Sequence, residues 1–225
     1  QVVIHLASQP LVLESYKNTK KTFETNVMGT INFFETLKKI KNIKKIIVFT
    51  SDKVYKNLKG NVLTENSSLG GIDPYSASKS CQDIISTSYK SSIYKKNIEI
   101  IILRAGNIIG GGDWNKYRLL PDIFKSIYKK NKIFIRNPNA IRPWQHILEI
   151  INVFLLIIIK KQKNTAHPDI YNIAPPKKSN ISVKELIKII KSIGKYSRFK
   201  YYIRKNSKHE SLTLKLSSIN AKKKN

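Results

Sequence analysis

The segment KIIVFTS, residues 45–51, is a short apolar run that stops abruptly in polar residues. Such a run is typical of a buried parallel strand, which is covered by helices on both faces. Similar runs occur on either side of it along the chain, VVIHLAS at 2–8 and IEIIILRA at 98–105. Helical patterns fill the intervals, at 19–41 and at about 75–95, and a polar loop covers 52–74. This alternation predicts an α/β fold with a parallel sheet.

The pattern changes after residue 107. We expect a helix at 119–130, a strand at 132–136, an apolar helix near 146–160, a strand at 169–175 and a helix at 182–194. Ser182 and Glu185 have the spacing of a capping box at the start of this last helix. We therefore divide the chain into residues 1–107 and a second part, 108–225, whose elements interleave with the first and whose tail frays after about 215.

The composition favours an ordinary globular protein with one unusual property, a net charge of +28 from 42 basic and 14 acidic residues. This charge raises a lysine-rich nucleic-acid binder as an alternative function. The lysines are spread along the whole chain, however, which favours solvated surfaces over a specific nucleic-acid site. No apolar stretch is long enough to span a bilayer, no secretory signal is visible, and Cys81 is the single cysteine. These features predict a cytoplasmic protein without a membrane partner.

Arginine and glycine concentrate in the middle of the chain. Four of the six arginines fall between 104 and 142, and six of the nine glycines fall between 70 and 112. Arginine presents a planar fork that suits phosphate, and glycine permits close backbone approach. Anion binding is therefore expected in the middle third.

Polar residues follow the strand at 45–50 at once: Ser51, Asp52 and Lys53. Ligands of open α/β sheets bind beyond the carboxyl ends of the strands, so chemistry is expected here. A plain turn would also favour Ser and Asp, and the segment alone leaves both interpretations open.

The segment DPYSASKS, residues 73–80, places Tyr75 and Lys79 four residues apart, on one face of the predicted helix. A lysine ammonium beside a phenol lowers the phenol pKa, so that Tyr75 can act as a base near neutral pH. The pair alone is equally an ordinary helix start. The polar strand ends upstream, in HLAS and FTSDK, favour an active site.

This order of parts resembles the extended short-chain dehydrogenase/reductase family and its NAD-dependent epimerases and dehydratases. There, a Ser or Thr after one strand and a Tyr-x-x-x-Lys helix form the hydride-transfer site. HLASQP at 5–10 is similar to the turn that borders the cofactor, and TNVMGT at 25–30 to an Asn-x-x-Gly-Thr helix that orders the lysine. RAGNIIGGGDW at 104–114 and IRNPNAIRPWQH at 135–146 resemble dehydratases of nucleotide-activated glucose, above all of CDP-glucose.

The resemblance implies a partial Rossmann-type, doubly wound parallel sheet in 1–107 and a small substrate-binding part in 108–225. It implies NAD as cofactor, a nucleotide sugar as substrate, no metal, and a homodimer or higher homo-oligomer of the complete protein. The catalytic residues it implies are Ser51, Asp52, Lys53, Tyr75 and Lys79. The implied cofactor contacts are Leu6, Ala7, Asn26, Thr50, Tyr75, Lys79 and Ala105. The implied substrate contacts are Gln9, Asn107, Arg118, Leu119, Arg136 and Arg142.

The implied reaction is a 4,6-dehydration that feeds deoxysugars into surface polysaccharide. Tyr75 removes the proton of the 4-hydroxyl, Lys53 takes the C5 proton, and Asp52 protonates the departing 6-hydroxyl. Related dehydratases carry an acidic residue at the position of Lys53, and Lys53 can instead pair with a substrate phosphate. The open alternatives are dTDP- or GDP-sugar dehydration and sugar-nucleotide epimerisation.

The chain contains no glycine-rich phosphate loop between a strand and a helix. We therefore expect a fragment that lacks the first strands of the fold and stops short of the usual C-terminus. A fragment of this kind exposes an apolar sheet edge.

Overall fold

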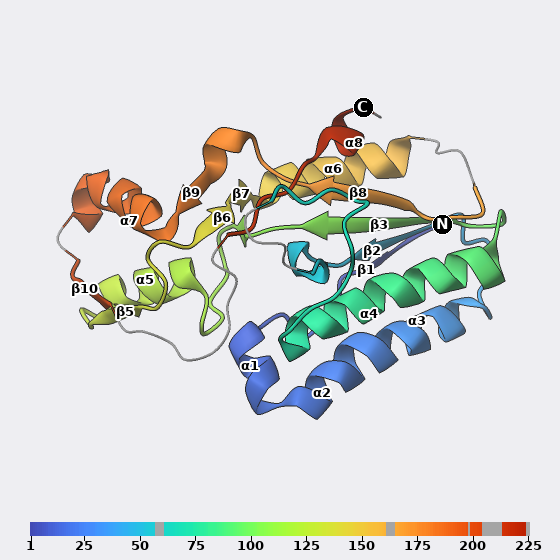
Figure 1. Cartoon of the computed structure of the whole chain (residues 1–225), viewed down its shortest axis with the longest axis horizontal. Helices are drawn as coiled ribbons and strands as arrows, with labels where there is room; N and C mark the ends of the chain where they lie inside the picture. The colour runs from blue at the N-terminus through green and yellow to red at the C-terminus, as the bar shows by residue number, and fades with distance from the viewer. Residues whose placement is uncertain (57–60, 161–164, 198, 204–212, 224–225) are drawn as a thin grey trace.

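The computed structural model describes residues 1–225 except 57–60, 161–164, 198, 204–212 and 224–225. Its centre is a four-stranded sheet in the order β1-β2-β3-β8, with every neighbouring pair parallel (Figure 1). The strands are β1 (Val2–His5), β2 (Lys45–Phe49), β3 (Glu99–Ala105) and β8 (Asp169–Ile173). The predicted parallel α/β fold is confirmed, and β8 returns to the sheet from the second part of the chain.

Helices cover both faces of this sheet, as a doubly wound fold requires. On one face lie α3 (Gly29–Leu37) and α4 (Pro74–Ser88), and on the other lie α6 (Ile147–Ile159) and α8 (Ile219–Lys223) (Figure 1). Successive residues of a strand point to opposite faces, so Ile46 and Val48 join the first core while Ile47 joins the second.

The predicted helix at 19–41 is broken into pieces. Its parts are α2 (Thr19–Phe23), a π-helical turn η1 (Glu24–Met28) and α3, with an unpredicted α1 (Val12–Lys17) before them. The helix predicted at 75–95 is α4 followed by a second π-helical turn, η3 (Tyr89–Tyr94). Apolar periodicity indicates the helical stretch but does not distinguish α-helical turns from π-helical ones.

The second part forms its own apolar cluster. It contains α5 (Leu119–Tyr128), α7 (Val183–Ser192) and the parallel pair β5 (Ile133–Ile135) and β10 (Tyr201–Ile203). The predicted capping box is confirmed: the Ser182 hydroxyl accepts from the Glu185 backbone N–H at 3.1 Å, and the Glu185 carboxylate accepts from the Ser182 N–H at 2.7 Å. β10 was not predicted, because it lies in a polar, lysine-rich stretch.

Short strands connect the second part to the sheet. β4 (Ile108–Ile109) pairs with β7 (Gln145–His146), and β6 (Ile141–Pro143) pairs antiparallel with β9 (Asn180–Ser182). A 3₁₀ turn, η2 (Asp52–Val54), follows β2, and two more, η4 (Lys177–Ser179) and η5 (Gly194–Tyr196), flank α7. The carboxyl ends of the central strands point toward α5 and α7 (Figure 1).

The tail differs from the prediction that it frays after about residue 215. Leu216 is buried and forms a bridge with Leu63, and Ala221 of α8 packs against the core above β8. The tail is held in place by single apolar residues within a polar stretch. Isolated contacts of this kind have no periodicity in the sequence, so they could not be predicted. Residues 224–225 lie outside the described part.

The apolar edge expected of the sheet is present at β1, where Val2 and Ile4 are 38% and 39% exposed. Within the described ranges, no helix has both the length and the apolar character needed to cross a membrane.

Candidate active site

A pocket of about 750 Å³ opens beyond the carboxyl ends of β1, β2 and β3, facing the start of α5. Thirteen of the predicted site residues line it. They are Leu6, Thr50, Ser51, Asp52, Lys53, Tyr75, Lys79, Ala105, Asn107, Arg118, Leu119, Arg136 and Arg142. Residues far apart in the sequence are thus brought together where an open α/β sheet binds its ligands.

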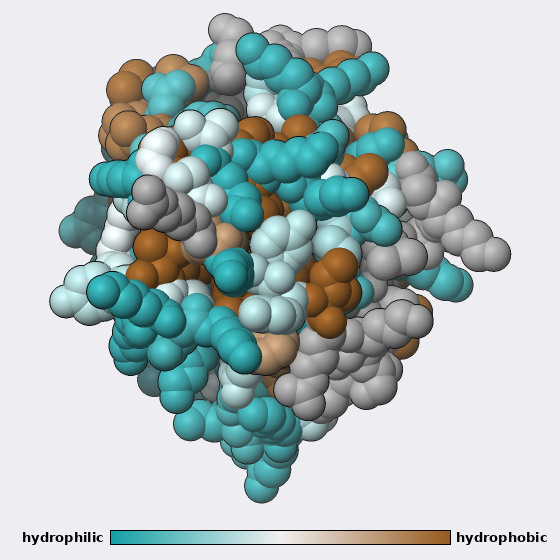
Figure 2. Space-filling model, turned by 90° about the vertical axis from the view of Figure 1, so that its left-hand side faces the viewer, coloured by the Kyte–Doolittle hydropathy of each residue, from teal (hydrophilic) through white to brown (hydrophobic). Residues whose placement is uncertain are grey.

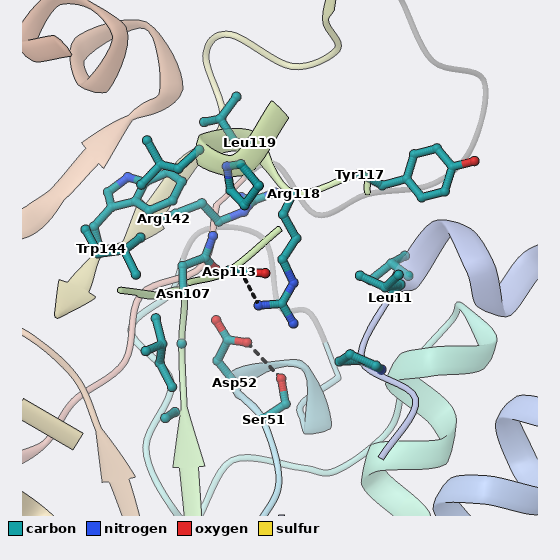
Figure 3. Close-up of a pocket in the computed structure, with 18 of the residues that line it drawn as sticks. Leu11, Ser51, Asp52, Asn107, Asp113, Tyr117, Arg118, Leu119, Arg142 and Trp144 are labelled. Carbon is teal, nitrogen blue, oxygen red and sulfur yellow. Dashed lines mark hydrogen bonds and ion pairs between the residues drawn. The ribbon is translucent and has the colours of Figure 1, made fainter. Parts of the chain in front are cut away.

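The end of β2 supplies a buried carboxylate. The Ser51 hydroxyl caps η2 by accepting from the Lys53 backbone N–H at 3.2 Å, and it donates to Asp52 Oδ1 at 3.1 Å (Figure 3). Asp52 is only 2% exposed, and its other oxygen, Oδ2, has no hydrogen-bond partner among the described residues. A buried carboxylate oxygen without a donor is costly, which is the condition expected of an oxygen that meets a ligand group.

Gly106 keeps this oxygen accessible. A Cβ at that position would lie 3.1 Å from Asp52 Oδ2 and 2.5 Å from the Pro143 ring. Any side chain at position 106 would therefore force Pro143 to move and would crowd the free carboxylate oxygen. In the sequence, Gly106 is marked only by its membership of the glycine-rich stretch between 70 and 112.

Helix α4 places Tyr75 opposite this carboxylate. The Asp73 side chain caps the helix by accepting from the Ser76 N–H at 2.9 Å, and Pro74 occupies the first turn, where no N–H is needed. The phenol is buried, and burial raises the pKa of Tyr75 to about 12. A hydrogen bond with Ser51 and the positive charge of Arg118 act in the opposite direction.

The direction of the Tyr75 pKa shift contradicts the sequence-based prediction that Lys79 lowers it. The Lys79 ammonium donates to the Gln82 side-chain oxygen at 2.8 Å and toward the Phe49 carbonyl at 3.4 Å. Two of its three donors thus face the protein interior, and desolvation lowers the pKa of Lys79 itself to about 8. Helical spacing places two residues on one face, but the direction of a long side chain depends on acceptors that the sequence does not reveal.

Three predicted residues do not line the pocket: Ala7, Gln9 and Asn26. The Asn26 amide accepts from the Gln9 backbone N–H at 2.7 Å and donates to the Ser78 hydroxyl at 2.8 Å. The Gln9 side chain folds back to donate to the Thr22 hydroxyl at 2.9 Å. Asn26 therefore fastens the turn after β1 to α4. It makes no direct hydrogen bond to Lys79 among the described contacts, and its role in ordering the lysine stays a prediction.

The opposite wall carries arginines. Arg142 on β6 is only 4% exposed, while Arg118, at the start of α5, forms an ion pair with Asp113 at 3.1 Å (Figure 3). Five cationic side chains line the pocket against the two carboxylates of Asp52 and Asp113: Lys53, Lys79, Arg118, Arg136 and Arg142. This excess of positive charge suits an anionic ligand such as a diphosphate.

Sequence reasoning missed Asp113 and Tyr117 as pocket residues. Asp113 lies at the end of a glycine run, and Tyr117 has a positive φ of 65°. The unusual backbone of this loop could have been suspected from Gly110, Gly111 and Gly112 alone.

His5, Trp144 and His146 are each held by contacts within the protein. His5 stacks on Phe33 with ring centroids 4.3 Å apart, and the Trp144 indole donates to the Ile181 carbonyl at 3.2 Å. His146 caps α6 by accepting from the Leu148 N–H at 3.3 Å. Trp144 and His146 line the pocket as well. Across the described ranges, no cluster of His, Cys, Asp and Glu is arranged to hold a metal ion.

The surface at this end of the molecule is mixed in character. Figure 2 shows the end of the molecule that faces left in Figure 1, with hydrophilic side chains distributed over it and apolar groups between them.

Comparison with known proteins explains this arrangement. The sequence model of the NAD dependent epimerase/dehydratase family matches residues 1–174. The chain belongs to this family. Members related to it by sequence include CDP-glucose 4,6-dehydratase of Salmonella typhimurium, 42% identical over 164 residues, which are 70% of this chain and 46% of that protein. The dTDP-D-glucose 4,6-dehydratase of Dictyostelium discoideum is 30% identical over 202 residues, 84% of this chain and 44% of that protein.

The fold of this family member is found in solved structures as well. MoeE5 in complex with UDP-glucuronic acid and NAD superposes with a TM-score of 0.88 over 99% of this chain and 71% of that chain, at 16% identity. The chain spans about half the length of the curated relatives it matches. Epimerase/dehydratase membership thus accounts for the parallel sheet and for the pocket at its carboxyl edge.

Proposed function

We propose that this chain is the catalytic and sugar-nucleotide-binding part of an enzyme that uses NAD to convert CDP-glucose into CDP-4-dehydro-6-deoxyglucose. The observation that carries the proposal is the buried Asp52 carboxylate, whose unpartnered Oδ2 faces the pocket beside Ser51 and Tyr75. Oxidation and reduction at C4 alone require one base at the 4-oxygen. Removal of the 6-hydroxyl requires, in addition to that base, an acid that protonates the departing oxygen.

NAD would bind on the sheet side of the pocket. Leu6 and Ala105 give it an apolar lining, and the Lys79 ammonium, with two hydrogen bonds directed inward, has one N–H left for a ligand hydroxyl. When bound there, NAD would accept a hydride from C4 of the sugar and return it to C6.

The residues of the chain would handle the protons. Tyr75 would take the proton of the 4-hydroxyl, with Ser51 bonded to the same oxygen. The new ketone acidifies the C5 proton, which Lys53, at the turn after β2, would remove. Asp52 Oδ2, protonated for this step, would give its proton to the 6-hydroxyl, which leaves as water. With hydride returned to C6, Lys53 would give its proton back to C5, and the proton held by Tyr75 balances the one that Asp52 lost. The overall change is therefore the loss of one water and no net oxidation.

The arginine wall would hold the nucleotide. Arg142 and Arg136 flank the segment 137–141, and their guanidinium forks suit the diphosphate. The choice of CDP over other nucleotides rests on the similarity to the Salmonella dehydratase, the most extensive in identity among the relatives described above. A role in deoxysugar supply for surface polysaccharide belongs to the same proposal.

The test uses protein expressed from the complete reading frame around this chain. It is incubated with CDP-, dTDP-, UDP- and GDP-glucose, and the products are separated by mass. We expect loss of water from CDP-glucose without stoichiometric consumption of added NAD. Preference for dTDP-glucose would contradict the nucleotide assignment, and conversion to an isomer of equal mass would show an epimerase instead.

A further inference from the structure

The Lys79 ammonium is held from behind by a neutral amide. Its Nζ lies 2.8 Å from the Gln82 side-chain oxygen, and both side chains are buried, Lys79 at 3% and Gln82 at 0% exposure. The second contact, to the Phe49 carbonyl, is longer at 3.4 Å. Gln82 is therefore the principal acceptor of the lysine within the described structure.

The orientation of the Gln82 amide is fixed by its other end. Gln82 Nε2 donates to the Thr30 hydroxyl at 3.0 Å, and the Thr30 hydroxyl donates its single hydrogen to the Asn26 carbonyl at 2.6 Å. Flipping the amide would place its oxygen against a hydroxyl with no hydrogen to offer and its NH₂ group against an ammonium. The buried oxygen must therefore face Lys79.

His5 completes the chain of hydrogen bonds. Its Nε2 lies 3.1 Å from the same Thr30 hydroxyl, which already donates to Asn26, so Nε2 carries the hydrogen and donates. The pKa of His5 is lowered to about 4, chiefly by burial and also by the charge of Lys79, so the imidazole is neutral near pH 7. The chain runs from His5 on β1 through Thr30 on α3 to Gln82 and Lys79 on α4.

We propose that Gln82 is a positioning residue for the reaction, whose carbonyl, oriented by Thr30 and His5, holds the Lys79 ammonium in place and in its charged form. This proposal rests on the proposed function, in which Lys79 serves the NAD and Tyr75 side of the pocket. It adds to that function a set of buried residues behind Lys79, namely Gln82, Thr30 and His5, which controls the charge of the lysine.

The surroundings of Lys79 explain why an amide matters. The titratable groups near it are His5 on β1, which is neutral, Asp52 on η2, which accepts from Ser51, and Tyr75 on the same helix. Asp83, also on α4, is bound by Arg104 through two hydrogen bonds of 2.7 Å. From β2, the Phe49 carbonyl lies 3.4 Å from the Lys79 ammonium. Within the described residues, Lys79 makes no hydrogen bond or ion pair with a carboxylate, so the Gln82 oxygen is the group that offsets burial.

The test replaces Gln82 in two directions. Gln82→Met keeps the volume and removes the acceptor, so the Lys79 midpoint should fall by about one pH unit. Gln82→Glu has the same shape and supplies a charged acceptor, so the midpoint should rise by about one unit or more. Ser86→Ala, one turn further along α4 and bonded only to the Gln82 backbone carbonyl, is the matched control and should leave it unchanged.

The measurement is competitive trace acetylation of the protein from the complete reading frame, with the labelling of Lys79 followed by peptide mass spectrometry across pH. The alkaline limb of kcat/KM for CDP-glucose, measured in parallel, should move in the same direction as the Lys79 midpoint for each variant. If Gln82 had a purely structural role, both variants would have a lower melting temperature. The Lys79 midpoint and the alkaline limb would then not shift in opposite directions in Gln82→Met and Gln82→Glu. Should Gln82→Met fail to fold, Thr30→Val, which removes the group that orients the amide, should lower the midpoint in its place.

Folded Gln82 variants with the wild-type Lys79 midpoint, or with midpoints shifted the same way, would overturn the proposal. Opposite shifts in labelling would support it even if the wild-type protein dehydrated none of the nucleotide sugars, a result that would count against the proposed function alone.

Discussion

The two walls of the pocket are built differently. The sheet wall consists of Ser51, Asp52, Tyr75 and Lys79, which are all buried and are held by strand ends, a capped helix and a network of hydrogen bonds. The other wall carries Arg118 and Arg136, which are partly exposed and lie on loops, with Arg142 buried on a short strand. Groups that must meet a reacting atom need a fixed position, whereas a phosphate is held by charge over a wider range of geometries. We therefore expect substitutions in the first wall to change kcat and those in the second to change KM.

The largest effect should come from Tyr75→Phe, which removes only the hydroxyl that would take the substrate proton. We expect kcat to fall by about 10³-fold, within the usual range for a general base, with a small change in KM. Steady-state assays with CDP-glucose measure both constants. Retention of a tenth or more of the wild-type kcat would remove Tyr75 from the chemistry, provided that thermal unfolding shows the variant to be folded.

Asp52→Asn should divide the sheet wall into two functions. The amide cannot give a proton to the departing hydroxyl, so dehydration should fall by about 10²-fold or more, while oxidation at C4 continues. In a single turnover, reduced nicotinamide should accumulate in Asp52→Asn, whereas it does not accumulate in the wild type. Its absorbance measures this accumulation. Equal loss of both steps would mean that Asp52 supports Ser51 and Tyr75 rather than the leaving group.

The second wall should respond in KM. Arg142→Lys keeps the positive charge and loses the planar fork, so KM for CDP-glucose should rise about tenfold with kcat within about twofold of wild type. The same change at Arg136 should have a smaller effect, because that side chain is more exposed. A fall in kcat without a rise in KM for Arg142→Lys would erase the distinction between the walls.

The smallest effect should be on stability. The pKa of His5 is about 4 in the folded protein and about 6.5 in an unfolded chain, so the unfolded state binds more protons between these values. The free energy of unfolding should therefore fall as the pH drops from 6.5 to 4, and His5→Gln should reduce that slope. Urea unfolding at several pH values measures it, and an unchanged slope in His5→Gln would assign the acid sensitivity to other groups.

The sequence predicted the first wall better than the second, for physical reasons. Buried strands and amphipathic helices leave periodic patterns, and polar residues at strand ends mark the active edge of a parallel sheet. The position of Asp52 could be predicted in this way, but not its unpartnered oxygen, which depends on Gly106 and Pro143 being close in space.

Hydrogen-bond partners over long sequence distances were beyond sequence reasoning. Lys79 turns to Gln82, and Asn26 turns to Gln9 and Ser78, because buried polar groups take whichever partners the packing provides. In the second part, the strand β10 and the ordered tail are held by isolated apolar contacts that have no repeat in the sequence. The arginines were found because they stand out in a lysine-rich chain.

The central claim is that hydrogen moves within one sugar, from C4 to C6, as water leaves. CDP-glucose deuterated at C4 and incubated in ordinary water with protein from the complete reading frame tests it directly. The account predicts CDP-4-dehydro-6-deoxyglucose that retains the deuterium at C6, even when unlabelled reduced cofactor is added in excess. A dehydrated product without deuterium at C6, or labelled sugar returned with its water intact, would contradict it.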